Sequence, residues 1–254
     1  MINNKVIIHV PHSSLSVPDF FLERLKVDRD YFNKMNIYES DYLIEHFIPD
    51  DCNSVIFNYS RMFCDVERFR DDNDEYMAKH FRRGVVYELD SNKKEFVDID
   101  DDYKDFVKSR YYDYHHKELL DKTNEIMSKY AECIIVDLHS YSDSYVSKTS
   151  NNDINNINPD ICIGFNDYDR NKHIINRIQL LCNKYSYTNS LNYPYSGSLV
   201  PLEYLNDDKV TSVMLEINKR IYLNNDLNEL DDVKSNILKN FMRDIFNQLK
   251  GIKL

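Results

Sequence analysis

The chain has 254 residues, of which 42% are hydrophobic and 13% aromatic, which is enough to bury a substantial core and excludes a disordered protein. Acidic residues (43) outnumber lysines and arginines (32), and the formal net charge of −11 disfavours nucleic acids and anionic membranes as partners. The length is normal for one α/β enzyme domain, so without a linker or repeat we expect residues 1–254 to form a single domain.

The cysteines favour a reducing compartment. Five of them are scattered along the chain and none forms a Cys-x-x-Cys pair: Cys52, Cys64, Cys133, Cys162 and Cys182. We therefore expect reduced thiols in a cytoplasmic protein. Residues 1–5 lead directly into a strand pattern, so we expect no signal peptide. No apolar run approaches the roughly 18 residues that a membrane span needs.

The amino-terminal half predicts two strands that are each followed by polar residues. Residues 5–10 form a short apolar run that a proline ends, and residues 54–59 form a second run. Between them, helices are predicted over 18–25 and 30–47, the latter with aromatic residues near helical spacing. Residues 60–68 then form a segment rich in charged and sulphur-containing side chains.

The middle of the chain predicts a long loop and a long helix. Residues 69–102 are charged and rich in turn residues, so we expect an ordered loop over the functional site, with a short strand possible over 84–87. Residues 103–130 form an amphipathic pattern that leads into a strand, an arrangement typical of βαβ units.

The carboxyl-terminal half contains the central strand, an apolar run from Ile134 that breaks at His139. A polar, asparagine-rich loop is expected over residues 147–159. The remaining predicted elements are strands over 161–165 and 211–217, helices over 173–184 and 230–250, and a turn over 192–198.

Three strand ends carry residues suited to metal chemistry: His12, His139 and Glu216. Ligands of open α/β sheets are held at the carboxyl ends of the strands. Asp137 lies two residues before His139, on the same strand face, where an acid can orient the imidazole. Taken alone, each residue has a more common structural interpretation, since a histidine after a strand is more often structural and a glutamate at a strand end usually forms a salt bridge. Together they supply imidazoles for zinc and a carboxylate to accept a proton from water, as metal-assisted hydrolysis requires.

Five motifs, in this order, resemble the N-formylglutamate amidohydrolase family. The resemblance extends from about residue 6 to residue 223, and no single motif carries it alone. The motifs are Pro11-His12-Ser13-Ser14, Ser60-Arg61 with Asp65-Val66-Glu67-Arg68, Asp137-Leu138-His139-Ser140, Asn192-Tyr193-Pro194-Tyr195-Ser196-Gly197, and Leu215-Glu216-Ile217-Asn218 with Tyr222.

That family is similar in fold to the zinc carboxypeptidases, which implies an α/β domain with a mixed, mostly parallel sheet flanked by helices. Zinc carboxypeptidases take two ligands from one His-x-x-Glu loop, but here Leu15 stands three residues after His12. The resemblance therefore requires a carboxylate from elsewhere. Asp41 is the first candidate because the family carries an acid in the first long helix, and Glu39 is the second. The alternative is that both are helix-surface acids.

The resemblance implies one zinc ion bound by His12, Asp41 and His139. Glu216 would take the proton of the attacking water, and Arg68 would hold a substrate carboxylate with both arms of its guanidinium. Asp65 and Asp137 would orient the two imidazoles. Further candidates for substrate contact are Arg61, Arg83, Arg220, Tyr195 and Gly197, for which salt bridges or packing are equally good interpretations.

The implied reaction is hydrolysis of a linear amide in a small anionic N-acyl amino acid, such as N-formyl-L-glutamate, giving formate and glutamate. Two alternatives stay open: a zinc carboxypeptidase or cell-wall amidase that acts on peptides, and a non-catalytic domain that binds a small ligand. His115-His116 partly resembles a Pro-Tyr-His segment of the family, but adjacent residues face different sides of a helix, so joint metal binding is not expected. No glycine-rich phosphate loop or Gly-x-Ser-x-Gly motif is present.

Overall fold

The computed structural model describes residues 4–149 and 158–253, which divide into two compact units. The first unit consists of Met1–Val10, Leu43–Val55 and Leu119–Leu254, and the second of Pro11–Tyr42 and Ile56–Glu118. Each unit is thus assembled from segments that are distant in the sequence. The expectation of one domain over the whole chain stays a prediction.

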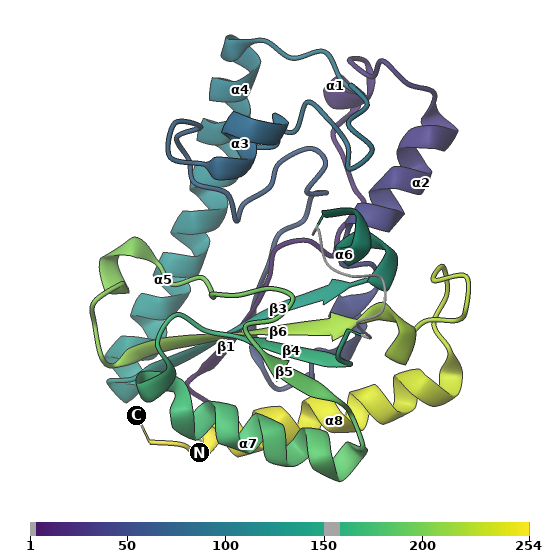
Figure 1. The fold of residues 1–254 in the computed structure, drawn as a ribbon. Coiled ribbons are helices and arrows are strands. Elements are labelled where there is room, and N and C mark those ends of the chain that lie inside the picture. The colour runs from purple at the N-terminus through teal and green to yellow at the C-terminus, as the bar shows by residue number, and fades with distance from the viewer. Residues whose placement is uncertain (1–3, 150–157, 254) are drawn as a thin grey trace. The chain divides into compact units, whose positions relative to one another are not determined.

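The first unit is built on a six-stranded sheet with the order β2-β1-β3-β6-β4-β5 (Figure 1). β1 pairs with β3, β3 with β6, and β4 with β5, all in parallel, whereas β4 runs antiparallel to β6. The predicted class, an α/β fold with a mixed and mostly parallel sheet flanked by helices, is confirmed. The strands are β1 (Val6–Val10), β2 (Asn53–Ile56), β3 (Cys133–Tyr141), β4 (Ile161–Gly164), β5 (Asn189–Leu191) and β6 (Val210–Asn218).

The central strands are longer than predicted. β3 continues two residues beyond His139, and β6 continues two beyond Glu216, because the parallel pairing of β3 with β6 extends through Ser140 and Tyr141. Every residue of both strands is buried, polar ones included. His139 and Glu216 therefore lie inside their strands, as direct partners in the register, and not in loops after them.

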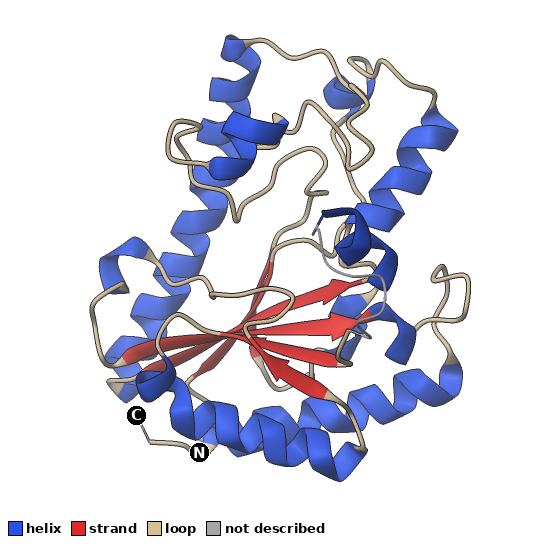
Figure 2. Ribbon diagram, viewed as in Figure 1, coloured by secondary structure: helices blue, strands red, loops and turns tan. Residues whose placement is uncertain are grey.

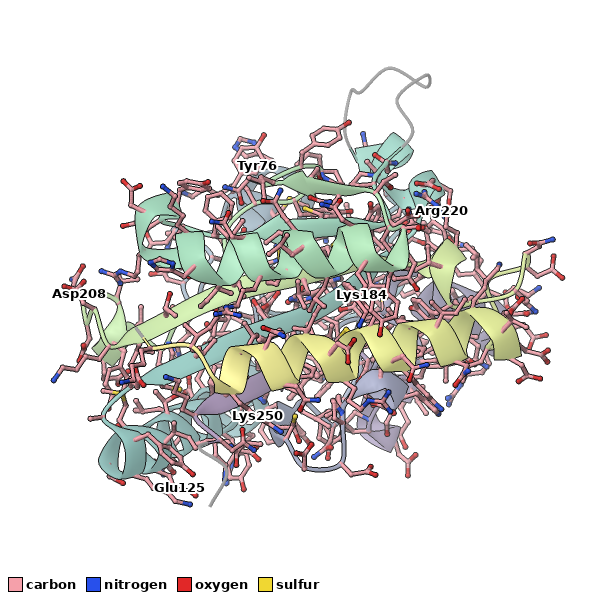
Figure 3. All side chains as sticks on the ribbon, turned by 90° about the horizontal axis from the view of Figure 1, so that it is seen from below. Tyr76, Glu125, Lys184, Asp208, Arg220 and Lys250 are labelled. Atoms are coloured by element: carbon pink, nitrogen blue, oxygen red, sulfur yellow. The ribbon has the colours of Figure 1, made fainter. Side chains whose placement is uncertain are left out.

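Helices cover both faces of this sheet (Figure 2). The part of α5 (Asp113–Tyr130) that belongs to the first unit packs through Leu119 and Ile126 against Ile7 and Ile135. On the opposite face, Thr211 of β6 donates to Asn171 of α7 (Tyr168–Tyr185) at 2.5 Å. Figure 3 shows α7 and α8 (Asp232–Lys250) side by side over that face. The short helices of this unit are η1 (Ile44–Phe47), α6 (Asp143–Thr149), η3 (Leu202–Tyr204) and η4 (Lys219–Ile221).

The second unit has a core of aromatic side chains. Phe21, Phe32, Phe63 and Phe96 are buried together, and the rings of Phe21 and Phe63 meet edge to face at 5.6 Å between centroids. Cys64 and Val66 belong to the same core, so segment 60–68 is anchored on both sides of Asp65. The helices of this unit are α1 (Asp19–Leu22), α2 (Arg29–Glu39), α3 (Tyr76–Phe81), α4 (Asp101–Val107) and the π-helical turn η2 (Lys108–Tyr112), which continues into α5.

Several predicted elements differ from the structure. The helix expected over 30–47 ends at Glu39, because Ser40 adopts an extended conformation, and the chain then turns through Leu43 in the left-handed region with φ of 64° before η1. The helix expected over 103–130 begins at Asp101, where Asp100 caps it, and η2 interrupts its α-helical pattern. The strand expected over 84–87 is only an isolated bridge between Arg83 and Tyr87. Most of the loop expected over 147–159 lies outside the described residues.

The thiols give a direct test of the packing. Four cysteines are buried and all five are free, and burial raises the pKa of Cys52 to about 11 and that of Cys133 to about 12. Since only thiolates react quickly with DTNB, the native protein is expected to show almost no rapid reaction at pH 8. Denaturation without a reductant should release all five thiols. A lower count would reveal a disulfide and contradict this packing.

Candidate active site

In the second unit, His12 lies in a buried position beside two carboxylates. Its Nε2 atom is 2.8 Å from Asp65 Oδ1, and its Nδ1 atom is 3.7 Å from Asp41 Oδ2. The backbone N–H of Asp41 donates to the His12 carbonyl at 2.9 Å, which fixes the two residues relative to each other. With Asp65 ionised, Nε2 is the protonated nitrogen of a neutral ring, and Nδ1 is then the nitrogen that can bind a metal.

Electrostatics favour the neutral form of His12. Burial, and next the positive charge of Arg61, lower the pKa of His12, although Asp65 acts in the opposite direction. A neutral imidazole is the form that binds metal ions. Imidazole, carboxylate acceptor and charge environment are therefore all suited to a metal ligand at position 12.

Asp65 is a fully buried carboxylate that gathers polar groups from four side chains. Its Oδ1 atom binds His12, and its Oδ2 atom accepts from Arg61 Nη2 at 2.8 Å and from the Tyr87 hydroxyl. Arg68 Nε lies 3.4 Å from Oδ2. Burial alone would raise the pKa of Asp65, but Arg61, His12 and Arg68 outweigh it and hold the pKa well below its ordinary value.

Glu67 is a candidate metal ligand that was not predicted from the sequence. Its carboxylate and the ring of His12 each offer a ligand atom, and these atoms lie within 4.8 Å of each other. The Glu67 N–H donates to Asp65 Oδ1 at 3.0 Å, which is the geometry of an Asx-turn. The motif Asp65-Val66-Glu67-Arg68 could have indicated it, because an aspartate that forms an Asx-turn fixes the backbone of the residue two positions later, which here is Glu67.

Two residues near the start of α5 hold the backbone on either side of Glu67. The ring of His116 is 2.7 Å from the Val66 carbonyl through Nε2, and the Tyr112 hydroxyl donates to the Arg68 carbonyl at 2.7 Å. Tyr112 closes the π-helical turn η2, a type of distortion that is frequent at functional sites. His115 instead packs edge to face on Phe57 at 5.1 Å, as expected for an adjacent residue on a different helix side.

Glu39 and Arg83, predicted as an alternative metal ligand and as a substrate contact, form a buried ion pair with each other. The other carboxylate oxygen of Glu39 accepts from the Ser91 N–H at 2.7 Å. The Arg83 guanidinium also lies 4.2 Å from the centre of the Tyr87 ring. These contacts give both residues a role inside the second unit, while their predicted roles toward metal and substrate stay predictions.

In the first unit, Asp137 lies between two histidines on the α5 side of the sheet. Its Oδ1 atom is 2.7 Å from His9 Nδ1 and 3.3 Å from His139 Nε2, and its Oδ2 atom accepts from the Leu199 N–H at 3.2 Å. Burial would raise the pKa of Asp137, but its contacts with His139 and His9 hold the pKa well below its ordinary value. Glu216 lies next to His139 on the same face, as the register of β3 and β6 requires.

The remaining predicted contacts of this unit have intramolecular partners. Arg220 pairs with Asp143 and with Asp160, both at 2.9 Å. The carbonyl of Tyr195 accepts a hydrogen bond from the Cys162 thiol at 3.2 Å. Gly197 has a φ of +87°, a conformation that favours glycine. The roles of Arg220, Tyr195 and Gly197 toward a substrate stay predictions.

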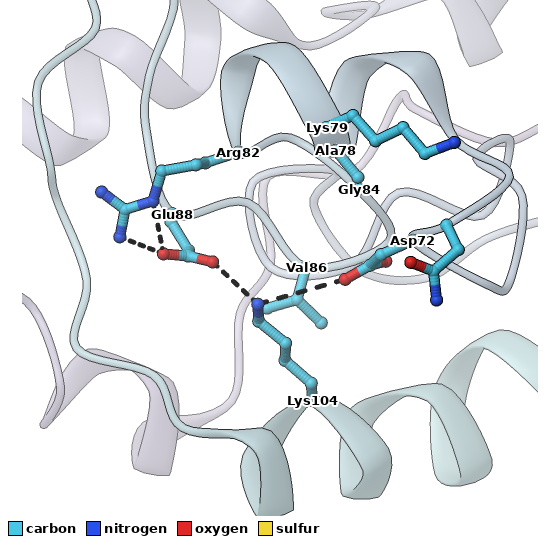
Figure 4. Close-up of a pocket in the computed structure, with 9 residues that line it drawn as sticks. Asp72, Ala78, Lys79, Arg82, Gly84, Val86, Glu88 and Lys104 are labelled. Carbon is cyan, nitrogen blue, oxygen red and sulfur yellow. Dashed lines mark hydrogen bonds and ion pairs between the residues drawn. The ribbon is translucent and has the colours of Figure 1, made fainter.

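A separate cavity of about 120 Å³ lies in the second unit and is lined by charged residues (Figure 4). Lys104 binds Glu88 at 2.8 Å, and Arg82 binds the same carboxylate, so the lining charges largely neutralise one another. None of the predicted site residues lines this cavity. The candidate site is therefore defined by the two histidine–aspartate groups and not by this cavity.

The chain matches the model of the N-formylglutamate amidohydrolase family over residues 4–223. It belongs to this family, as its motifs indicate.

Two solved structures share the fold. N-formylglutamate amidohydrolase from Ralstonia eutropha JMP134 is 14% identical, with a TM-score of 0.80 over 96% of this chain and 92% of that one. A gene product of Agrobacterium tumefaciens is 15% identical, with a TM-score of 0.66 over 98% of this chain and 91% of that one. No curated protein matches the sequence significantly. Among the described residues, no helix has the length and apolar character to cross a membrane.

The charges around Asp65 make a prediction about stability. Asp65→Asn should lower the free energy of unfolding by ~3 kcal/mol, because it leaves the guanidiniums of Arg61 and Arg68 without their buried carboxylate. As a control, Asp113→Asn removes the exposed partner of Arg70 and should cost less than ~1 kcal/mol. Urea unfolding followed by tyrosine fluorescence measures both.

The pH dependence of that difference has a definite sign. The folded pKa of Asp65 lies well below the ordinary value of 3.8, so the stabilisation is complete above that value. The gap between wild type and Asp65→Asn should stay constant at neutral pH and shrink as the pH falls below 3.8. A gap that grew on acidification would contradict an ionised Asp65.

Proposed function

We propose that the protein hydrolyses a linear amide bond in a small acidic N-acyl amino acid, with N-formyl-L-glutamate as the first candidate and zinc as the metal. One observation carries the proposal: each unit contains a buried imidazole beside a buried, ionised carboxylate, His12 with Asp65 and His139 with Asp137. Metal-binding histidines typically have such a partner, which fixes the tautomer and raises the basicity of the ligand. Membership of the amidohydrolase family supports the same reaction class.

The proposed ligands are His12 and Glu67 of the second unit, whose ligand atoms lie within 4.8 Å of each other, and His139, which the family motifs supply. Two imidazoles and one carboxylate, with a fourth position for water, are a donor set that suits catalytic zinc. Glu67 replaces Asp41 as first choice because, among the described residues, its carboxylate and not that of Asp41 is grouped with His12 as a possible ligand. When bound, the metal would lower the pKa of a water molecule and polarise the amide carbonyl.

Glu216 is the proposed general base. It lies in the middle of the sheet beside His139, has an exposed fraction of only 8%, and is on the same sheet face as His139 and Asp137. A carboxylate held there would accept the proton of the attacking water and pass it to the departing amine. The rigid pairing of β3 with β6 would keep this proton acceptor at a constant separation from the imidazole.

Arg61 and Arg68 are the proposed anchors for a substrate carboxylate. Two guanidiniums share the single carboxylate of Asp65, so these three residues together carry one excess positive charge. Arg68 keeps 21% of its side chain exposed and can offer further N–H groups to an anion. This local charge suits an acidic substrate despite the overall charge of −11.

The ligand set predicts which variants lose metal. Wild-type protein reconstituted with zinc and dialysed should contain about one ion per chain, and His12→Ala, His139→Ala and Glu67→Gln should each lose it. Asp41→Asn is the matched control and should retain the ion. Elemental analysis gives the stoichiometry. If Glu67→Gln retained the ion and Asp41→Asn lost it, Asp41 would be the third ligand. If reconstituted wild-type protein contained no metal, this would contradict a hydrolytic centre and favour a binding domain.

The proposed base makes a separate prediction about turnover. Glu216→Gln should keep its zinc but lower kcat for formate release from N-formyl-L-glutamate by at least ~100-fold, since general base catalysis contributes this much. Formate is measured with a coupled dehydrogenase. Unchanged kcat would exclude Glu216 as the base, and release of amino acids from peptides in place of formate would favour the peptidase alternative.

A further inference from the structure

The hydroxyl of Tyr87 lies among three charged side chains of the second unit. It donates to Asp65 Oδ2 and accepts from Arg61 Nη2 at 3.1 Å and from Arg68 Nη2 at 3.3 Å. A phenol offers one O–H donor and two acceptor lone pairs, so these contacts use all of its capacity. Tyr87 therefore links one carboxylate to both proposed substrate-binding guanidiniums.

The ring of Tyr87 is also held by contacts that do not involve Arg68. The side chain is fully buried, and the guanidinium of Arg83 lies over the ring at 4.2 Å from its centre. Arg83 is itself fixed by its ion pair with Glu39, and its backbone pairs with Tyr87 in an antiparallel bridge. The hydroxyl is thus a fixed point from which flexible side chains can be positioned.

Arg68 depends on this hydroxyl more than Arg61 does. Arg61 keeps a direct hydrogen bond to Asp65 at 2.8 Å, whereas Arg68 Nε stands 3.4 Å from the same carboxylate. Arg68 is also the more exposed of the two, at 21% against 14% of the side chain. Removing the hydroxyl would leave Arg68 attracted to Asp65 but without a hydrogen bond that sets its orientation.

We propose that Tyr87 is a positioning residue that orients Arg68, and with it Arg61, toward a carboxylate of the substrate, and so determines the preference for acidic substrates. The inference rests on the proposed function, in which the two arginines bind substrate. A guanidinium recognises a carboxylate through two parallel N–H groups, so its orientation decides whether both bonds form.

Tyr87→Phe tests this role, because it removes the hydroxyl and keeps the ring. With N-formyl-L-glutamate, KM should rise about tenfold while kcat stays close to wild type, the loss expected for a misaligned charged contact. Two mono-amides, N-formyl-L-glutamine and N-formyl-L-isoglutamine, each lack one carboxylate. The rise in KM should vanish for the mono-amide that lacks the carboxylate held by Arg68. An equal effect on all three substrates, or no effect on any, would overturn the proposal.

Two further variants separate positioning from general stability. Tyr103→Phe is the matched control, because Tyr103 is buried in the same aromatic core and, among the described residues, its hydroxyl has no hydrogen-bond partner. It should leave KM unchanged. If Tyr87 acts through Arg68, the double variant Tyr87→Phe with Arg68→Lys should have the KM of Arg68→Lys alone. Additive losses would contradict action through Arg68.

A binding measurement keeps the test independent of turnover. Ligand-observed NMR titrations with L-glutamate, L-glutamine and L-isoglutamine compare wild type with Tyr87→Phe. We expect the variant to bind glutamate about tenfold more weakly than wild type and to bind one of the two mono-amides equally well. This result would support the inference even if wild type hydrolyses no N-acyl amino acid. In that case only the proposed reaction would be contradicted. Absence of glutamate binding by wild type would overturn the inference itself.

Discussion

The buried carboxylate of Asp65 is the constraint on which the second unit depends. An ionised group with no exposed surface survives only because His12, Arg61, Arg68 and Tyr87 surround it. Because the buried charge needs these partners, the position of each partner side chain is fixed as well. The interaction therefore does two things at once: it sets the tautomer of one imidazole and collects positive charge beside it. Asp137 imposes a similar constraint in the first unit, where it fixes two histidines on one sheet face.

The sequence predicted the parts of this arrangement that depend on local pattern. Apolar runs that end in polar residues located β1, β3 and β6, because a strand between two helical layers must be apolar over most of its length. The motifs also indicated His12, His139, Asp65 and Asp137, together with the family to which the chain belongs. Asp65 and Asp137 were recognisable because a metal-binding imidazole needs a hydrogen-bond acceptor for its other nitrogen, and both acids belong to the motifs.

Other features depend on tertiary contacts and could not be predicted. The exact ends of β3 and β6 follow from their mutual register, not from hydropathy, since polar side chains are buried in both. The clustering of Tyr87 with Asp65 joins segments 22 residues apart through a loop that has no periodic pattern. The position of the Glu67 carboxylate within 4.8 Å of a ring nitrogen of His12 could not be predicted, because it depends on how the chain folds around the Asx-turn at Asp65. The ion pair of Arg83 with Glu39 joins residues 44 positions apart, and no local pattern predicts it.

We propose that His12, Glu67 and His139 bind one catalytic zinc ion. Anomalous diffraction at the zinc edge from crystals of the reconstituted protein tests it most directly. We expect one strong peak at bonding distance, roughly 2.0–2.2 Å, from an imidazole nitrogen of each histidine and from a carboxylate oxygen of Glu67. A peak bound by other residues, or none within reach of both histidines, would contradict it.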